Sequence, residues 1–569
     1  MRIYGKDGSG QMDYQALAEL LFPDVKETPD EIEAKYPPRK LPEGAKVTRF
    51  APSPTGFVHF GGLFPVTVGE RLAHQSGGVF YLRIEDTDAK REVEGAKAGL
   101  IRTLAHYGIR FDEGATEDGD KGDYGPYTQS QRCAIYHVYA KQLVREGKAY
   151  PVFTTKEELA ALNAADKKAE IKAKEWHADQ GEQLEEMRRQ RQFTMEEVKA
   201  HLAASDPFVL RMLADGDPEK KFRITDLIKG NLELPENDRD EVLLKSDGVP
   251  SYHFAHAVDD HLMGTTHVIR GEEWLPSLPR HVMLFRYLGF RLPKYMHIAQ
   301  LMRLDENGNK KKLSKRDMGA NLDDYEKMGY APKTVMEYVM TLLNSNYEEW
   351  HAANPEASYL DFPFSIKKMS SSGCLFDFDK LNDVSKNVLA HMSAGEVYEG
   401  ALEWSKKFDP EFAPYLERDP DYAIRILSIG RGGKKPRKDL VTWADVKPYL
   451  SLFYDELFTI ESPIDESFDR QDIFRALKGF AGQYNEADDM NTWFEKIKAL
   501  CEPLGYCAET KLYRQNPEQY KGSVADISMF VRVAVTGRLA SPDLYTVMQI
   551  LGKERVLMRI HSYADTLGV

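Results

Sequence analysis

The sequence predicts an α/β fold in which a parallel sheet is interrupted by an insert and followed by a helical region. Residues 47–51 and 79–84 have the apolar pattern of short buried strands. Between them, residues 63–74 have helical spacing that ends at a pair of glycines. This strand–helix–strand unit is typical of parallel sheets that bind nucleotides. Beyond Tyr330 the apolar pattern is almost entirely helical.

A charge-rich stretch with helical character, residues 156–200, separates this unit from further strands expected at 242–245 and 267–270. We therefore expect one sheet that is split by an inserted domain. Residues 1–40 read as an amphipathic helix followed by a proline-containing linker. The sequence leaves open whether this segment docks on the rest of the chain or is a dispensable extension.

The chain has 569 residues, enough for about three to five domains. It contains no run of roughly 18 apolar residues, so no membrane span is expected. Residues 1–10 lack the apolar core of a secretion signal. The cysteines Cys133, Cys374, Cys501 and Cys507 are irregularly spaced, which indicates neither a disulfide framework nor a zinc ribbon. We expect a cytoplasmic protein with free thiols.

The net charge of −14 argues only mildly against a nucleic-acid partner, because RNA binding needs a local basic face. One segment offers such a face through Arg431, Lys434, Lys435, Arg437 and Lys438. On this segment alone two interpretations stay open, a contact for RNA phosphates and a solvated loop.

The segment at residues 49–62, RFAPSPTGFVHFGG, follows a strand and opens a helix. A helix N-terminus offers unpaired N–H groups to phosphate. Gly61 and Gly62 allow another molecule to approach the backbone closely. His59 can donate a hydrogen bond to a phosphate oxygen as charge shifts in a transition state. A second segment, KKKLSKR at residues 310–316, contains Lys312 and Lys315, whose ammonium groups could clamp a triphosphate.

Together these segments resemble the paired HIGH and KMSKS signatures of the class I aminoacyl-tRNA synthetases. The glycine at position 62, in place of the second histidine, is usual for the glutamyl branch of that family. The resemblance covers about residues 46–560. Further segments that match the branch are RIEDTD at 83–88, LLKSDGVPSYH at 243–253, VDDHLMGTTHVIRGEEW at 258–274, FDFDKL at 376–381 and LGKER at 551–555. Residues 1–40 fall outside it.

The resemblance implies a division into domains. It consists of an N-terminal helical extension and linker (1–44), the first half of a Rossmann-type catalytic domain (45–134), an inserted acceptor-stem-binding domain (135–243), the second catalytic half (244–318), a stem-contact domain (319–385) and all-α anticodon-binding domains (386–569). It also implies that the enzyme activates L-glutamate with ATP and transfers it to the 3′ end of tRNA(Glu). A monomer is expected.

For ATP, the resemblance implies contacts from His59, Gly61, Glu273, Trp274 and Lys315. The residues that act in catalysis would be His59, Gly61, Gly62, Lys312 and Lys315. Magnesium is expected to enter with ATP, bound mainly by phosphate oxygens and water. Relatives that hold zinc carry a Cys-x-Cys segment in the insert. Here the corresponding residues 149–154 contain no cysteine, so no zinc is expected.

For glutamate, the resemblance implies that Arg49 and Tyr252 meet the γ-carboxylate, Glu85 the amine and Arg270 the α-carboxylate, with help from Ser53. The residue types agree, since the planar fork of arginine suits a carboxylate. Taken singly, Glu85 and Arg270 are equally consistent with structural ion pairs.

The chain departs from the pattern at His256, where the branch often has asparagine. A histidine there is consistent with a pH-dependent hydrogen-bond donor in the pocket and with a core residue that has no direct role.

Three other interpretations were considered. Glutaminyl enzymes typically have PPEPNG and RFDDTN where this chain has APSPTG and RIEDTD. A short paralogue that glutamylates a modified tRNA base lacks an anticodon domain. A non-catalytic RNA-binding descendant would not need His59, Lys312 and Lys315. The sequence does not indicate whether tRNA for glutamine is also glutamylated.

Overall fold

The computed structural model describes residues 12–54, 56–88, 93–153, 190–313 and 319–569. The chain forms two compact units. One consists of Met1–Asp323 with Val339–Phe376, and the other of Asp324–Tyr338 with Asp377–Val569. In the described part of the chain, no helix combines the length and the apolar character needed to cross a membrane.

The first unit is built on parallel strands, as the sequence predicts. β1 (Val47–Phe50), β2 (Val79–Leu82) and β3 (Glu113–Ala115) pair in parallel, and β4 (Asp120–Lys121) adds an antiparallel edge. β10 (His267–Gly271) and β11 (Lys294–Ile298) form a second parallel pair. The backbone N–H of Thr266 donates to the carbonyl of Val47 at 3.0 Å, which brings β10 beside β1.

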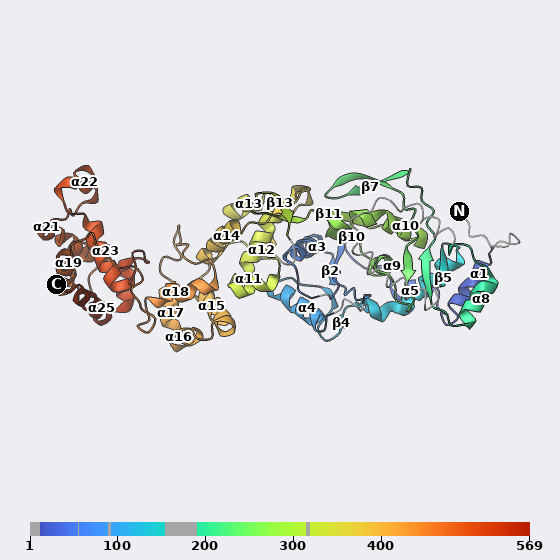
Figure 1. Ribbon diagram of the computed structural model, residues 1–569, viewed down its shortest axis with the longest axis horizontal. Helices are drawn as coiled ribbons and strands as arrows, with labels where there is room; N and C mark the ends of the chain where they lie inside the picture. The colour runs from blue at the N-terminus through green and yellow to red at the C-terminus, as the bar shows by residue number, and fades with distance from the viewer. Residues whose placement is uncertain (1–11, 55, 89–92, 154–189, 314–318) are drawn as a thin grey trace. The chain divides into compact units, whose positions relative to one another are not determined.

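The helix α3 (Leu63–Gln75) packs against β1, β2 and β10 (Figure 1). Gly69 allows this close approach, since a Cβ there would lie 2.9 Å from the Phe80 ring. The hydroxyl of Thr48 donates to the carbonyl of Gly69 at 2.8 Å. Nearly all residues of β1 and β2 are buried, as expected for short buried strands, although β1 contains the polar residues Thr48 and Arg49.

The insert forms two β structures. β5 (Ala149–Phe153), β6 (Phe208–Met212) and β9 (Val242–Leu244) make an antiparallel sheet. The strand expected at 242–245 is therefore present, but it pairs within the insert and not in the parallel sheet. β7 (Lys221–Asp226) and β8 (Gly230–Pro235) form a hairpin, and β7 joins β11 in parallel where Asp226 faces Tyr295.

Part of the helical stretch expected at 156–200, residues 154–189, lies outside the described residues, whereas α8 (Met195–Ala203) is a helix.

Residues 12–40 pack on the rest of the first unit, which favours the docking interpretation. α1 (Tyr14–Leu21) contacts α5 (Cys133–Arg145), and α2 (Pro29–Lys35) follows. The guanidinium of Arg39 donates to both carboxylate oxygens of Glu113 at 2.8 and 2.9 Å. Bidentate pairs of this kind are geometrically specific.

The first unit contains further helices and strands. They are α4 (Ala96–His106), α9 (Tyr252–Leu262), α10 (Leu278–Leu288), α13 (Tyr347–Ala353) and a small sheet of β12 (Leu301–Leu304), β13 (Lys310–Lys312) and β14 (Cys374–Leu375). Two helices, α11 (Leu322–Met328) and α12 (Pro332–Leu343), contain residues of both units.

The second unit is helical, as expected. Its helices are α14 (Phe378–His391), α15 (Ala394–Phe408), α16 (Ala413–Arg418), α17 (Pro420–Leu427), α18 (Val446–Ser451), α19 (Arg470–Gln483), α20 (Met490–Ala499), α21 (Cys501–Leu504), α22 (Thr510–Gln515), α23 (Val524–Thr536), α24 (Leu544–Leu551) and α25 (Lys553–Thr566). The predicted domain boundaries within both units stay predictions.

Candidate active site

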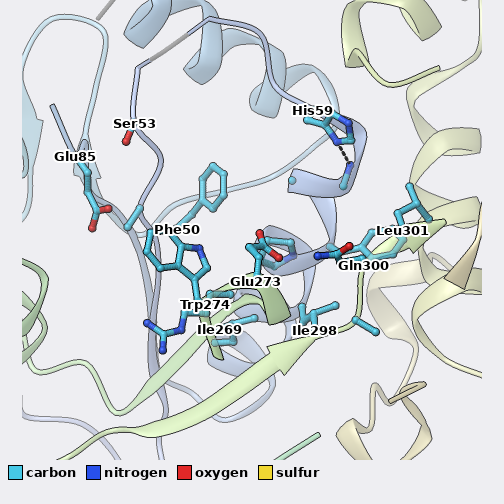
Figure 2. A pocket seen from close by; sticks show the side chains of 18 of the residues that line it. Phe50, Ser53, His59, Glu85, Ile269, Glu273, Trp274, Ile298, Gln300 and Leu301 are labelled. Carbon is cyan, nitrogen blue, oxygen red and sulfur yellow. Dashed lines mark hydrogen bonds between the residues drawn. The ribbon is translucent and has the colours of Figure 1, made fainter. Parts of the chain in front are cut away.

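A cavity of about 1050 Å³ lies where β1, β2 and β10 end. Ligands of open α/β sheets bind at the carboxyl ends of the strands. Figure 2 shows Ser53 and Glu85 on one side of the cavity and His59, Gln300 and Leu301 on the other. The predicted site residues that line it are Arg49, Ser53, His59, Gly61, Gly62, Glu85, Tyr252, Arg270, Glu273, Trp274 and Lys312. Lys315 lies outside the described residues.

His59 begins a tight turn on the cavity wall. Its Nδ1 accepts a hydrogen bond from the backbone N–H of Gly61 at 3.0 Å (Figure 2). In the neutral ring the proton is therefore on Nε2, which is the form that can donate to a phosphate oxygen. A Cβ at Gly61 would lie 3.2 Å from this Nδ1, whereas a Cβ at Gly62 would meet only Val58 at 3.7 Å.

A buried group of charges surrounds Asp260 on α9. Arg83 donates to it at 2.7 Å and to Glu85 at 2.8 Å. Arg49 donates to it through Nε at 3.2 Å. Burial alone would raise the pKa of Asp260, but the two guanidinium groups outweigh burial and hold this pKa well below its usual range. Asp260 is thus the ionised residue that orients Arg49.

The neighbouring residue on α9, Asp259, accepts hydrogen bonds from a second set of donors. Arg132 donates to it at 2.7 Å, and Tyr136 and Gln129 donate at 2.8 and 2.9 Å. A buried carboxylate is tolerated only when it is paired and hydrogen-bonded in this way. The two adjacent aspartates therefore hold different arginines. Asp260 contacts Arg49 and Arg83, and Asp259 contacts Arg132.

Arg270, on β10, has a different environment. Its Nε donates to Nε2 of His297 and its Nη1 to Nδ1 of His281, both at 2.9 Å. Its remaining nitrogen, Nη2, is buried and has no hydrogen-bond partner among the described residues. Burial lowers the pKa of Arg270. Of the two residues that were consistent with structural ion pairs, Glu85 makes one with Arg83, whereas no such pair is found for Arg270 in the described ranges.

His256 contacts two residues of the site, Asp260 and Tyr252. Its side chain is fully buried, its Nδ1 lies 2.8 Å from Asp260, and its ring stacks on Tyr252 at 5.7 Å between centroids. Burial outweighs the attraction of Asp260 and lowers the pKa of His256 to about 4. The ring is therefore neutral near pH 7 and is not a pH-dependent donor there, which favours the core interpretation.

The buried histidines predict a steep loss of stability in mild acid. Burial lowers the pKa of His253 to about 3, that of His256 to about 4 and that of His281 well below its usual value. Below pH of about 6.5 the unfolded chain binds protons that the folded chain does not, so stability falls as the pH drops toward 4. Each histidine is expected to cost about 1.4 kcal/mol per pH unit. Unfolding free energies at pH 7, 6 and 5 measure this, and the slope for His256→Gln should be shallower. Equal stability at pH 7 and 5 would contradict it.

The motifs assigned no role to Arg83 or Asp260, which shape the site most. For Arg83 the available signal was a charged side chain inside a segment expected to be a buried strand, whereas no element was expected around Asp260. His281 and His297 were also missed, since no local pattern marks them.

In the basic segment at residues 431–438, two arginines make contacts within the second unit. Arg431 donates to the carbonyls of Leu427 and Met392 at 2.7 and 3.1 Å. Arg437 pairs with Asp439 at 2.7 Å. An interaction with RNA would therefore depend on the exposed cations Lys434, Lys435 and Lys438.

In the described ranges, no group of three or more His, Cys, Asp or Glu side chains has the arrangement of metal ligands. The absence of zinc stays a prediction.

Comparison with known proteins decides the family. Residues 46–382 match the model of the class I tRNA synthetases (E and Q), catalytic domain, and residues 512–564 match an anticodon binding domain. A glutamate–tRNA ligase of Acetivibrio thermocellus is 48% identical over 554 residues, which cover 96% of this chain and 99% of the relative. The chain belongs to the glutamate–tRNA ligase family.

Another member of the family, from Clostridium perfringens strain 13, is 46% identical over 96% of this chain and 100% of its own length. A crystal structure of a glutamate tRNA ligase from Elizabethkingia meningosepticum, in complex with its amino acid, has a TM-score of 0.70 and 26% identity. It covers 92% of this chain and 99% of that chain. The predicted family and fold class are confirmed, and the glutaminyl and RNA-binding alternatives are disfavoured.

Proposed function

We propose that this chain joins L-glutamate to the 3′ end of tRNA(Glu) at the expense of ATP, using the cavity at the strand ends. The strongest support is the charge of the buried cluster. Its arginines are Arg49, Arg83, Arg132 and Arg270, and the carboxylates in direct contact with them are Asp259, Asp260 and Glu85. Arg49, Arg83 and Arg132 each contact at least one of these carboxylates, whereas the hydrogen bonds of Arg270 within the described residues go only to histidine nitrogens, so a ligand carboxylate would supply the counter-charge that Arg270 lacks.

The individual contacts follow from the same groups. Glu85 receives the ammonium, Arg49 and Tyr252 receive the γ-carboxylate, and Arg270 receives the α-carboxylate through its unpartnered Nη2. Burial, with a smaller contribution from Glu85, raises the pKa of Tyr252 to about 12, so its hydroxyl remains a donor.

Two steps complete the reaction. An α-carboxylate oxygen of glutamate attacks the α-phosphorus of ATP, and the bond to the β-phosphate breaks to release pyrophosphate. The terminal ribose hydroxyl of tRNA then attacks the carbonyl carbon, and AMP leaves. His59 donates through Nε2 to phosphate in the first step, and Lys312, with Lys315, stabilises the departing charge. No side-chain nucleophile is required.

Members of aminoacyl-tRNA synthetase families use ATP with Mg²⁺. In this chain Lys311 and Lys312, on the cavity wall, suit a triphosphate. We propose that Glu273 and Trp274 contact the nucleotide and that magnesium enters with it, held by phosphate oxygens and water. The cytoplasmic location and the monomeric state stay predictions.

The tRNA would be held at several places. We propose that residues 135–243 bind the acceptor end, that residues 319–385 contact the stem, and that the helical region from 386 reads the anticodon. Lys434, Lys435 and Lys438 are proposed phosphate contacts, and such contacts weaken with added salt.

Gly61→Ala should slow adenylate formation by roughly 10- to 100-fold, because the new Cβ crowds the His59 ring and a displacement of about 1 Å can cost 10² in rate. The control variant is Gly99→Ala on α4, outside the cavity lining, whose Cβ would meet nothing within 4 Å. Single-turnover rates of charging with saturating substrates make the comparison. Equal rates for the two variants would show that the placement of His59 is unimportant.

The proposed function is tested by charging total tRNA with labelled glutamate or glutamine in the presence of ATP and magnesium. We expect glutamate to be attached, and sequencing of the charged tRNA to identify tRNA(Glu) and to reveal whether tRNA for glutamine is included. Attachment of glutamine alone would contradict the γ-carboxylate contacts. Attachment of neither by folded protein would contradict the function.

A further inference from the structure

A carboxylate from the β7–β8 hairpin is connected to Arg270 by two hydrogen bonds, which share the ring of His297. Asp226, the last residue of β7, is only 1% exposed. One of its oxygens accepts from the backbone N–H groups of Ile228 and Lys229 at 2.9 and 2.8 Å. The other accepts from Nδ1 of His297 at 2.7 Å and from the backbone N–H of the same residue at 3.1 Å. Every one of these contacts uses Asp226 as an acceptor.

The contact with Asp226 determines where His297 carries its proton. A carboxylate can only accept, so Nδ1 of His297 carries the hydrogen and Nε2 has a lone pair. That lone pair accepts from Nε of Arg270 at 2.9 Å. Burial lowers the pKa of His297 although Asp226 opposes this, and the ring is therefore neutral. A carboxylate that orients a histidine in this way is a known device for fixing its tautomer.

His281 completes the support of Arg270 from the other side. Its Nδ1 accepts from Nη1 of Arg270 at 2.9 Å, so its proton is on Nε2, which faces Nδ1 of His253 at 2.8 Å. Arg270 is thus oriented by two neutral acceptors. This differs from Arg49, whose charge is shared with Asp260. A guanidinium held by neutral groups keeps its full charge for a ligand carboxylate.

We propose that Asp226 and His297 are positioning residues for the amino-acid site, which they serve by holding Arg270 in the orientation that receives the substrate carboxylate. The proposal rests on the proposed function, since it assigns Arg270 to a carboxylate of glutamate. It also means that the hairpin, which lies in the segment expected to bind the tRNA acceptor end, supplies part of the support for the amino-acid site.

Asp226→Asn separates this role from a purely structural one. The amide oxygen can still accept from Ile228 and Lys229, so the turn is kept. The amide nitrogen, on the side of His297, can no longer accept from the backbone N–H of that residue and, as a donor, favours the tautomer with the proton on Nε2. Arg270 then meets a donor where it had an acceptor, and loses a hydrogen bond to a charged group. We expect the KM for glutamate to rise about 10- to 100-fold, with an unchanged KM for ATP.

The matched control is Glu233→Gln on the same hairpin, where Glu233 makes an exposed ion pair with Arg223. It should leave the KM for glutamate unchanged. The readouts are KM and kcat for tRNA charging with glutamate and with ATP varied separately, the binding of glutamate by calorimetry, and the melting temperature.

The outcomes are distinguishable. If the wild-type enzyme charges tRNA with glutamate but Asp226→Asn has the wild-type KM for glutamate, the positioning role is overturned. It is also overturned if the variant loses affinity for ATP and glutamate equally together with its melting temperature, because that pattern indicates a structural role. If the wild-type enzyme does not charge any tRNA with glutamate, it is the proposed function that fails. A selective rise in the KM for glutamate supports the proposal.

Discussion

Charging with glutamate is expected to exceed charging with glutamine by about 10⁴–10⁵ in kcat/KM, without an editing reaction. Glutamine has nearly the same shape as glutamate but lacks one negative charge. It would leave Arg49 and Tyr252, the proposed contacts of the γ-carboxylate, facing a neutral amide in place of a charged group. A site whose buried polar groups require their partner rejects an analogue that lacks it much more strongly than a site that only measures size.

Steady-state charging of purified tRNA with each amino acid measures this preference. Tyr252→Phe removes one hydroxyl that is proposed to meet the γ-carboxylate, and should lower kcat/KM for glutamate by roughly 10- to 100-fold while affecting glutamine less. Tyr295→Phe is the control, since the Tyr295 side chain is buried and its hydroxyl has no hydrogen-bond partner among the described residues. A preference below 100-fold in the wild-type enzyme would contradict the charge argument.

Asp260→Asn should lower the free energy of unfolding of the first unit by about 3–5 kcal/mol, because removing one partner leaves buried charges uncompensated. Asp260 accepts from Arg83 at 2.7 Å and from Arg49 at 3.2 Å, and its side chain is not exposed. The asparagine keeps the shape but not the charge. Two arginines would then be buried, and among the described residues only Glu85 would offer either of them a carboxylate at hydrogen-bond distance.

Calorimetric unfolding, in which the transition of the first unit is followed, measures this loss. Asp118→Asn provides a control for removing an aspartate from an exposed position of the same unit. The control should leave stability unchanged. A loss below about 1 kcal/mol for Asp260→Asn, the size of a surface ion pair, would mean that Arg49 and Arg83 do not depend on Asp260.

Local sequence determined much of this protein. The apolar runs of β1 and β2 and the helical spacing of α3 were recognisable because a buried parallel strand and an amphipathic helix each leave a short, regular pattern. The turn at His59 and the glycine at 61 were recognisable because the site uses consecutive residues there. The residues that line the cavity come mostly from a few such segments, so the matching strings indicated where the site lies, although fewer than half of the lining residues were predicted as site residues.

Tertiary structure alone decided which groups support those residues. Asp260 and Arg83 are 177 residues apart, and Asp226 and His297 are 71 apart, so no local pattern connects them. The same limit explains β9, whose apolar run is clear in the sequence but whose partner, β6, is set by how the insert folds. A strand's pattern reports that one or both faces are buried, but not which strand will pair with it. The sequence therefore determined the fold class and pointed to several residues that line the cavity, whereas long-range packing determined the charges that hold them in place.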